Sequence, residues 1–96
     1  MAGFRLSAKA LGDLKSIGQY TERYWGREQR NKYLAMLDSC FHTLASEPEI
    51  GLACDYIKAG YQKYHAGRHL IFYRQGLKDI EIIRILHDRM DITSHF

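Results

Sequence analysis

After the first seven residues, the spacing of apolar residues changes once along the chain, near residue 60. Before that point apolar residues recur every three or four positions, as on one face of a helix that packs against a core. Beyond that point they alternate with polar residues, as in half-buried strands. The 96-residue chain is therefore predicted to form helices first and a sheet afterwards, which is an α+β fold.

The first part of the chain predicts a short strand followed by two helices. Residues 3–7 alternate in polarity, and helical spacing follows over residues 8–25 and 27–46. Ser7 is expected to cap the first helix, and Gly26 to end it and open an antiparallel helical hairpin. The predicted core positions are Leu11, Leu14, Ile17, Thr21 and Tyr24 in the first helix, and Tyr33, Leu34, Leu37, Phe41 and Leu44 in the second.

The second part predicts a loop over residues 49–60 and then three strands, at residues 61–65, 68–74 and 79–87. Short turns join the strands, which is typical of an antiparallel meander. The last strand is apolar on both faces, with Ile80, Ile82 and Leu86 expected on one and Ile83 and Ile85 on the other. Such a strand is usually central, so the first strand is expected beside it. We predict a single domain over residues 1–96: a helical hairpin on a four-stranded, mainly antiparallel sheet, in the order β-α-α-β-β-β.

Composition narrows the class of protein. No apolar stretch is long enough to cross a membrane, and the first residues lack the apolar core of a signal peptide, so we expect a cytoplasmic protein. Cys40 and Cys54 are then expected to be reduced thiols. No cofactor or metal is expected, because no ligand spacing or phosphate-binding glycine loop is present. The net charge of +3 permits an acidic partner or a nucleic acid but requires neither.

Several polar residues of the predicted sheet have two interpretations. A metal-free ribonuclease could use arginine to hold a phosphate, and histidine or tyrosine to move protons. Alternatively, Arg84 pairs with a buried partner and His87 forms a hydrogen bond at the end of its strand. Aromatic residues also lie near segment ends. Tyr24 is expected to cap the core, and Trp25 either caps the core or anchors a partner. Phe96, at the end of the chain, is expected to be either disordered or recruited to a surface.

Two segments of the second part carry a family pattern. Residues 67–74 (GRHLIFYR) resemble the signature strand of ParE toxins, and residues 83–92 (IRILHDRMDI) resemble their C-terminal motif. The chain is similar to that family at other places as well: Phe4-Arg5-Leu6-Ser7, Ala8, Ala10, Asp13-Leu14, Ile17, Tyr24-Trp25-Gly26, Leu44-Ala45, Pro48 and Gly51. Nearly the whole chain thus resembles the ParE branch of the RelE/ParE toxin–antitoxin superfamily.

This resemblance implies a RelE/ParE-like fold and a toxin of a type II system. It implies neutralisation by a cognate, ParD-like antitoxin whose C-terminal segment is disordered alone and wraps the toxin. ParE toxins poison DNA gyrase, so the resemblance implies a protein that binds and inhibits gyrase without catalysis. Nucleic acid would be reached only through gyrase or through the complex of antitoxin and operator.

Three functions stay open at this point. For a gyrase inhibitor, the target-binding candidates are Trp25, Asp91, Ile92, His95 and Phe96, and the antitoxin-binding candidates are Arg5, Tyr24, Tyr33, Arg68, Tyr73 and Arg84. The alternative is a ribosome-dependent mRNA endonuclease of the RelE type, with Arg68, Tyr73, Arg84 and His87 as candidate catalytic residues. His87 is the departure from the ParE pattern that favours this alternative. The third possibility is an inactive relative that only binds an antitoxin.

Overall fold

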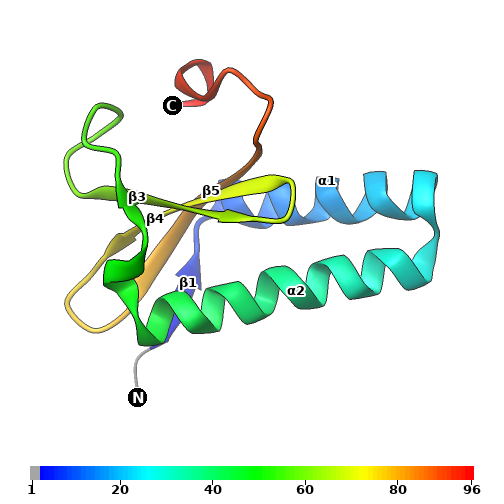
Figure 1. The fold of residues 1–96 in the computed structure, drawn as a ribbon, viewed down its shortest axis with the longest axis horizontal. Helices are drawn as coiled ribbons and strands as arrows, with labels where there is room; N and C mark the ends of the chain where they lie inside the picture. The colour runs from blue at the N-terminus through cyan, green and yellow to red at the C-terminus, as the bar shows by residue number, and fades with distance from the viewer. Residues whose placement is uncertain (1–2) are drawn as a thin grey trace.

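The computed structural model describes residues 3–96. Two helices lie side by side along one face of a sheet (Figure 1). The C-terminal segment, residues 91–96, lies apart from the helices. This arrangement confirms the predicted α+β architecture. The elements are β1 (Phe4–Leu6), α1 (Ala8–Trp25), α2 (Arg27–Ser46), η1 (Pro48–Ile50), β2 (Leu52–Ala53), β3 (Tyr61–Ala66), β4 (His69–Gln75), β5 (Ile80–His87) and η2 (Ile92–His95).

The sheet has five strands in the order β1-β5-β4-β3-β2. β1 is parallel to β5, and the other neighbours are antiparallel. The predicted place of the first strand beside the last is therefore confirmed. The prediction of four strands was wrong by one, because Leu52–Ala53, inside the predicted loop, pairs with Lys63 and Gln62 of β3. Two residues carry too little alternation to mark a strand in the sequence.

The helical hairpin begins and turns as its sequence predicts. The Ala10 N–H donates to Ser7 Oγ at 3.0 Å, and Ser7 Oγ donates to the Ile83 carbonyl at 2.7 Å, so one side chain caps α1 and ties it to β5. Gly26 has φ +91°, a conformation that favours glycine, and its N–H donates to the Glu22 carbonyl. The chain thereby passes from one helix to the next through a single residue.

Apolar residues are buried on both faces of the sheet. The main core lies between the helices and the sheet, and it contains Ile17, Leu37, Phe41, Leu44, Ile71, Tyr73, Ile80, Ile82 and Ile85. A second cluster, on the face away from the helices, contains Cys54, Phe72 and Leu86, with Ile57, Tyr61, Leu70 and Ile92 packed against it. Cys40 and Cys54 are both free thiols.

A bulge in β5 changes which residues share a face. Phe72 of β4 lies opposite Arg84, whereas the next residue, Tyr73, lies opposite Ile82, so Ile83 is an extra residue in β5. The prediction that Leu86 shares a face with Ile80 and Ile82 was therefore wrong, as was its placement of Ile85 on the opposite face; uninterrupted alternation does not describe this strand. The bulge places Ile85 towards the helices, with Arg84 and Leu86 on the other face.

The tip of the hairpin extends beyond the sheet (Figure 1). In α1 the last buried residue is Thr21, and in α2 the first is Leu37. The expectation that Tyr24 caps the core was wrong, because its side chain lies past the sheet and is 59% exposed. Helical spacing shows which side of α1 faces the sheet, but it does not show where the sheet ends. Leu11, another predicted core residue, is also exposed.

Candidate functional site

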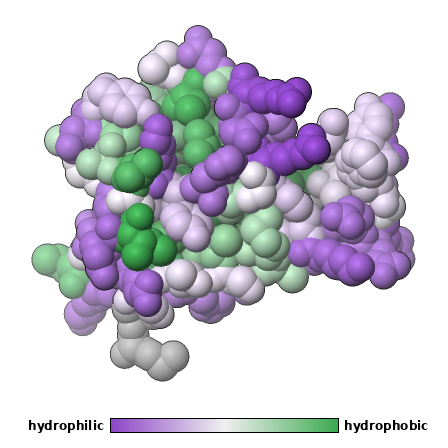
Figure 2. Space-filling model, in the orientation of Figure 1, coloured by the Kyte–Doolittle hydropathy of each residue, from purple (hydrophilic) through white to green (hydrophobic). Residues whose placement is uncertain are grey.

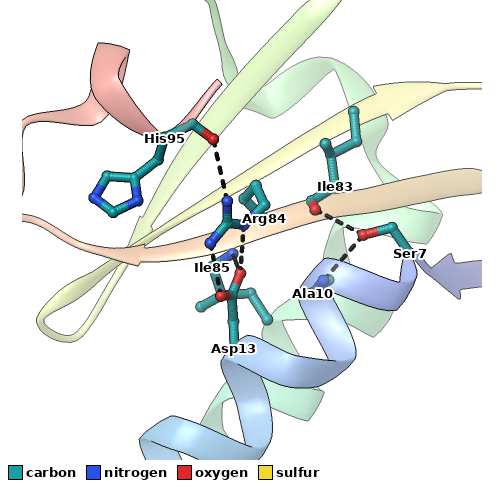
Figure 3. Close-up of polar contacts among 7 residues, drawn as sticks. All are labelled: Ser7, Ala10, Asp13, Ile83, Arg84, Ile85 and His95. Atoms are coloured by element: carbon teal, nitrogen blue, oxygen red, sulfur yellow. Dashed lines mark hydrogen bonds and ion pairs between the residues drawn. The ribbon is translucent and has the colours of Figure 1, made fainter.

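Arg84 of β5 is held in place by Asp13 of α1 (Figure 3). Its Nε and Nη2 donate to the two carboxylate oxygens of Asp13, each at 2.9 Å, and both side chains are only 15% exposed. The hydrogen bond to Asp13 raises the pKa of Arg84 above its usual value. Asp13 also accepts the Ile85 N–H at 2.9 Å. The predicted structural role of Arg84 is confirmed, since its charge is engaged inside the fold.

The C-terminal segment folds back over the face of the sheet that the helices do not cover. Arg84 Nη1 donates to the His95 carbonyl at 3.1 Å (Figure 3). The Phe96 ring lies 5.0 Å from the Phe72 ring and 6.0 Å from the Tyr61 ring, centroid to centroid. Ile92 joins the second apolar cluster. Of the target-binding candidates in this segment, Ile92 and Phe96 are therefore partly used in packing, whereas Asp91 is exposed.

Tyr73 belongs to the core and not to a surface. It is fully buried, and its hydroxyl donates to the Pro48 carbonyl at 2.7 Å and accepts the Gly51 N–H at 2.9 Å. Burial raises the pKa of the hydroxyl. This tyrosine thus fixes the segment around η1 to β4. In this position it can contact neither an antitoxin nor a phosphate group.

Imidazoles gather where the turn between β3 and β4 meets the end of β5. The Tyr33 hydroxyl contacts His69 Nδ1 at 2.5 Å and accepts the Arg68 N–H at 3.0 Å. In the tautomer of His69 that carries its proton on Nε2, Nδ1 accepts the proton of the Tyr33 hydroxyl, and we assign this tautomer. Burial, with a smaller contribution from nearby His87, lowers the pKa of His69 from 6.5 to about 4. His69 is therefore neutral near pH 7 and accepts the tyrosine proton at Nδ1.

Asp88 joins two further imidazoles to this cluster. Its carboxylate lies 3.1 Å from His65 Nε2 and 3.4 Å from His87 Nδ1, and the His87 and His69 rings are 5.3 Å apart. His87 Nδ1 also accepts the Arg89 N–H, which confirms its predicted hydrogen bond at the strand end. Half-exposed imidazoles beside a carboxylate can exchange protons with a ligand. We call this set the imidazole cluster: Tyr33, His65, Arg68, His69, His87 and Asp88.

The structure separates the four residues of the ribonuclease hypothesis. Arg68 and His87 lie at the imidazole cluster, where the Asp88 N–H donates to the Arg68 carbonyl at 3.0 Å. Tyr73 and Arg84 are engaged elsewhere, as described above. His65, His69 and Asp88 are not among these four candidates. The sequence gives one signal for the two histidines, which flank a predicted tight turn.

The candidates for partner binding also fall into separate places. Tyr33 and Arg68 are in contact, but Arg5 is exposed on β1 and Tyr24 lies at the hairpin tip. Trp25, 69% exposed, is twelve residues beyond Asp13 on α1, which corresponds to about 18 Å along the helix axis. Because Asp13 contacts Arg84 and Arg84 contacts the C-terminal segment, Trp25 lies well away from the point where that segment meets the sheet.

A groove runs between the two helices. Gly18 has no side chain, which leaves space beside Leu34. Leu14 and Leu34 both line the groove, so part of the groove surface is apolar. An ion pair between Arg30 and Glu22 spans it. Among residues 3–96 no group of side chains has the geometry of a metal site. In the same range neither helix combines the length and apolar character needed to cross a membrane.

Comparison with known proteins identifies the family. The family model for "ParE toxin of type II toxin-antitoxin system, parDE" matches residues 4–92. The chain belongs to the ParE toxin family. Similar relatives include Toxin ParE1 of Caulobacter vibrioides, 38% identical over 99% of this chain and 98% of that protein. Toxin ParE1 of Mycobacterium tuberculosis is 41% identical over 96% of this chain and 95% of that protein.

Solved structures support the ParE-type fold. A chain of the chromosomal ParDE toxin–antitoxin system of P. aeruginosa has a TM-score of 0.78 at 20% identity, over 91% of this chain and 96% of that one. A chain of the toxin–antitoxin complex RelBE2 of Mycobacterium tuberculosis has a TM-score of 0.65 at 21% identity, over 90% and 96%. At these identities the likeness concerns the fold, which ParE and RelE toxins share.

Proposed function

We propose that this ParE-family toxin acts in the cytoplasm by binding and inhibiting DNA gyrase, and that it has no catalytic activity of its own. The observation that carries the proposal is the engagement of Arg84 and Tyr73 in the fold. Arg84 is bound to Asp13 and to the His95 carbonyl, and Tyr73 is fully buried. A phosphate would have to compete with Asp13 for the guanidinium. Two of the four residues proposed for RNA cleavage are thus occupied.

Inhibition without catalysis requires a difference in affinity. A bound protein shifts the equilibrium between two states of an enzyme only if it binds one of them more tightly. The toxin would therefore bind the state of gyrase in which the DNA is cleaved more tightly than the resealed state. Trp25 and the C-terminal segment are the candidate contacts. Full toxicity after removal of residues 91–96 would refute the part assigned to that segment.

The antitoxin is proposed to be a ParD-like protein whose C-terminal segment folds on the toxin. The groove between α1 and α2 offers Leu14 and Leu34 to an apolar face of the antitoxin's C-terminal segment. Exposed Arg5 and Arg68 offer charges at the sheet, one on β1 and one in the turn after β3. A segment that is disordered alone can reach surfaces this far apart, because it extends over the toxin as it folds.

The test uses purified toxin, relaxed plasmid, ATP and gyrase. The expected result is loss of supercoiling with accumulation of linear DNA, and its reversal by the product of the neighbouring reading frame. Cells that express the toxin should show DNA breaks and filamentous growth. Unimpaired supercoiling at a large excess of toxin over gyrase would contradict the proposal.

The imidazole cluster favours a second candidate function, a ribosome-dependent mRNA endonuclease. Neutral His69, half-exposed His87 and the carboxylate of Asp88 could move protons at a bound RNA, with Arg68 beside the phosphate. Programmed ribosomes incubated with the toxin would then yield cleaved mRNA, and His87→Ala would abolish the cleavage. Intact mRNA in this assay excludes the candidate.

A further inference from the structure

One face of α1 continues past the sheet. Asp13, Ile17, Tyr20 and Tyr24 follow one another at steps of four, three and four residues, so they lie on one side of the helix. Asp13 and Ile17 use this side to reach the sheet and the core. Tyr20 and Tyr24 continue it at 60% and 59% exposure. The same side of α1 therefore packs on the protein at Asp13 and Ile17 and is exposed to solvent at Tyr20 and Tyr24.

The open part of this face carries an ordered set of aromatic groups. The rings of Tyr20 and Tyr24 are 4.7 Å apart, and the Arg23 guanidinium lies 5.7 Å from the centre of the Tyr24 ring. Trp25 follows Tyr24 as the last residue of the helix and is 69% exposed. Tyrosine, tryptophan and arginine are the residues that most often dominate the binding energy of protein interfaces. Because the rings already pack on one another, binding would cost little of their rotational freedom.

The charges at the tip give the chemistry of a partner. Glu22 pairs with Arg30, and Glu28 lies 3.6 Å from Lys32, so both carboxylates near the tip have cationic neighbours. Arg23 and Arg27 form no ion pair with any residue in the range 3–96. The excess charge at the tip is therefore positive, and it complements a surface that carries carboxylates.

We propose that the tip patch, consisting of Tyr20, Arg23, Tyr24, Trp25 and Arg27, is the surface on which the target protein docks, through an acidic area with apolar side chains. This inference rests on the proposed function, because it takes gyrase as that target. It assigns Tyr24 to the target and not to the antitoxin. It also ranks the tip above the C-terminal segment, whose Ile92 and Phe96 are partly used in covering the sheet. The tip is the pale and purple end of the molecule at the right of Figure 2, where arginine is hydrophilic and the aromatic residues are near neutral on the colour scale.

The test compares a tip variant, Arg23→Glu with Trp25→Ala, with a control variant, Tyr56→Ala. Tyr56 is 66% exposed in the loop before β3, and this loop lies at the opposite end of the molecule from the hairpin tip (Figure 1). All three proteins should unfold at the same urea concentration, because the substituted side chains are exposed. We expect the concentration for half-inhibition of gyrase supercoiling to rise at least about tenfold for the tip variant and to stay unchanged for the control.

A second measurement reports on the tip directly. Trp25 is the single tryptophan, so 5-fluorotryptophan labels this position alone. Its fluorine resonance should shift or broaden when unlabelled gyrase is added. Inhibition by the tip variant equal to that of the wild type, or an unchanged resonance, would overturn the inference while leaving the proposed function intact. If the tip variant still inhibited gyrase but no longer bound the product of the neighbouring gene, the tip patch would belong to the antitoxin-binding surface. That result would also overturn the inference. A wild type that leaves gyrase unaffected would overturn the proposed target, and this inference with it.

Discussion

Arg84 and Asp13 form a bidentate ion pair across 71 positions of sequence, and the remaining terminal nitrogen of the guanidinium binds the His95 carbonyl. The Arg84 side chain thus connects α1, β5 and the C-terminal segment. The pairing of β1 with β5 ends at Leu6, which lies opposite Ile82. Farther along the same edge of β5, the Ile85 N–H donates to the Asp13 carboxylate. Asp13 therefore supplies one hydrogen-bond acceptor to β5, and its ion pair with Arg84 joins the two layers.

Asp13→Ala should lower the free energy of unfolding by about 2–4 kcal/mol. The change leaves a largely buried guanidinium without its carboxylate, and the Ile85 N–H without its acceptor. Urea unfolding followed by circular dichroism measures the loss. Glu81→Ala is the matched control, because it breaks the more exposed pair with Arg74 and should cost below about 1 kcal/mol. Equal losses in the two variants would contradict the structural role of Asp13.

Tyr73→Phe should destabilise the protein by about 1–3 kcal/mol, because the Gly51 N–H and the Pro48 carbonyl both lose their partner. Gly51→Ala should destabilise it more, since a Cβ there would overlap the Tyr73 hydroxyl and ring. Thermal unfolding compares the two variants with Tyr56→Phe, whose exposed hydroxyl should matter little. An unchanged melting temperature for Tyr73→Phe would show that the hydroxyl does not hold the η1 segment.

Protonation of His69 should make the fold sensitive to acid. Its pKa is about 4 in the folded protein against 6.5 ordinarily, so the unfolded chain binds more protons between these values. Stability should therefore fall as the pH falls from about 6.5 to about 4, by roughly 3 kcal/mol from this group. His69→Gln, which keeps an acceptor for the Tyr33 hydroxyl, should remove that part of the loss, whereas exposed His42→Gln should not. Identical pH profiles for the wild type and His69→Gln would contradict the assignment.

The sequence predicts the fold well where the information is local. Ser7, Gly26 and the two periodicities identify the capped hairpin and the strands with few errors. The failures concern distant residues. The bulge at Ile83 depends on how β4 and β5 pair, and the exposure of Tyr24 depends on where the sheet ends. The sequence around Asp13 shows only a charged residue in a helix. Its role depends on Arg84 and Ile85 of β5, which are distant in the sequence, so neighbouring residues do not predict it.

The C-terminal segment illustrates the same limit at the functional sites. Phe96 was predicted to be free or recruited to a surface, and the structure shows that the surface is the protein's own sheet. Its partners, Phe72 and Tyr61, are identifiable only after the register of β3 and β4 is known. The imidazole cluster likewise forms because the turn at residues 67–68 brings His65 and His69 to one end of the sheet.

Removal of residues 91–96 should expose the apolar cluster beneath that segment. Ile92 packs against the cluster that contains Phe72 and Leu86, and the Phe96 ring lies against the Phe72 ring. The free energy of unfolding should fall by about 1–3 kcal/mol, given the partial burial of the two side chains, and a dye that binds apolar surface should gain fluorescence. Ser94→Ala is the control, because its exposed side chain bonds only to the Asp91 carbonyl. Unchanged stability and dye binding after truncation would show that the segment does not cover the sheet.

Gyrase supercoiling in the presence of wild-type toxin and of His87→Ala separates action by binding from action by proton transfer. We expect both proteins to abolish supercoiling at the same concentration, because we assign the imidazole cluster no part in binding gyrase. Supercoiling that continues at a large excess of wild-type toxin, or inhibition that is lost with His87→Ala in a folded protein, would contradict this expectation.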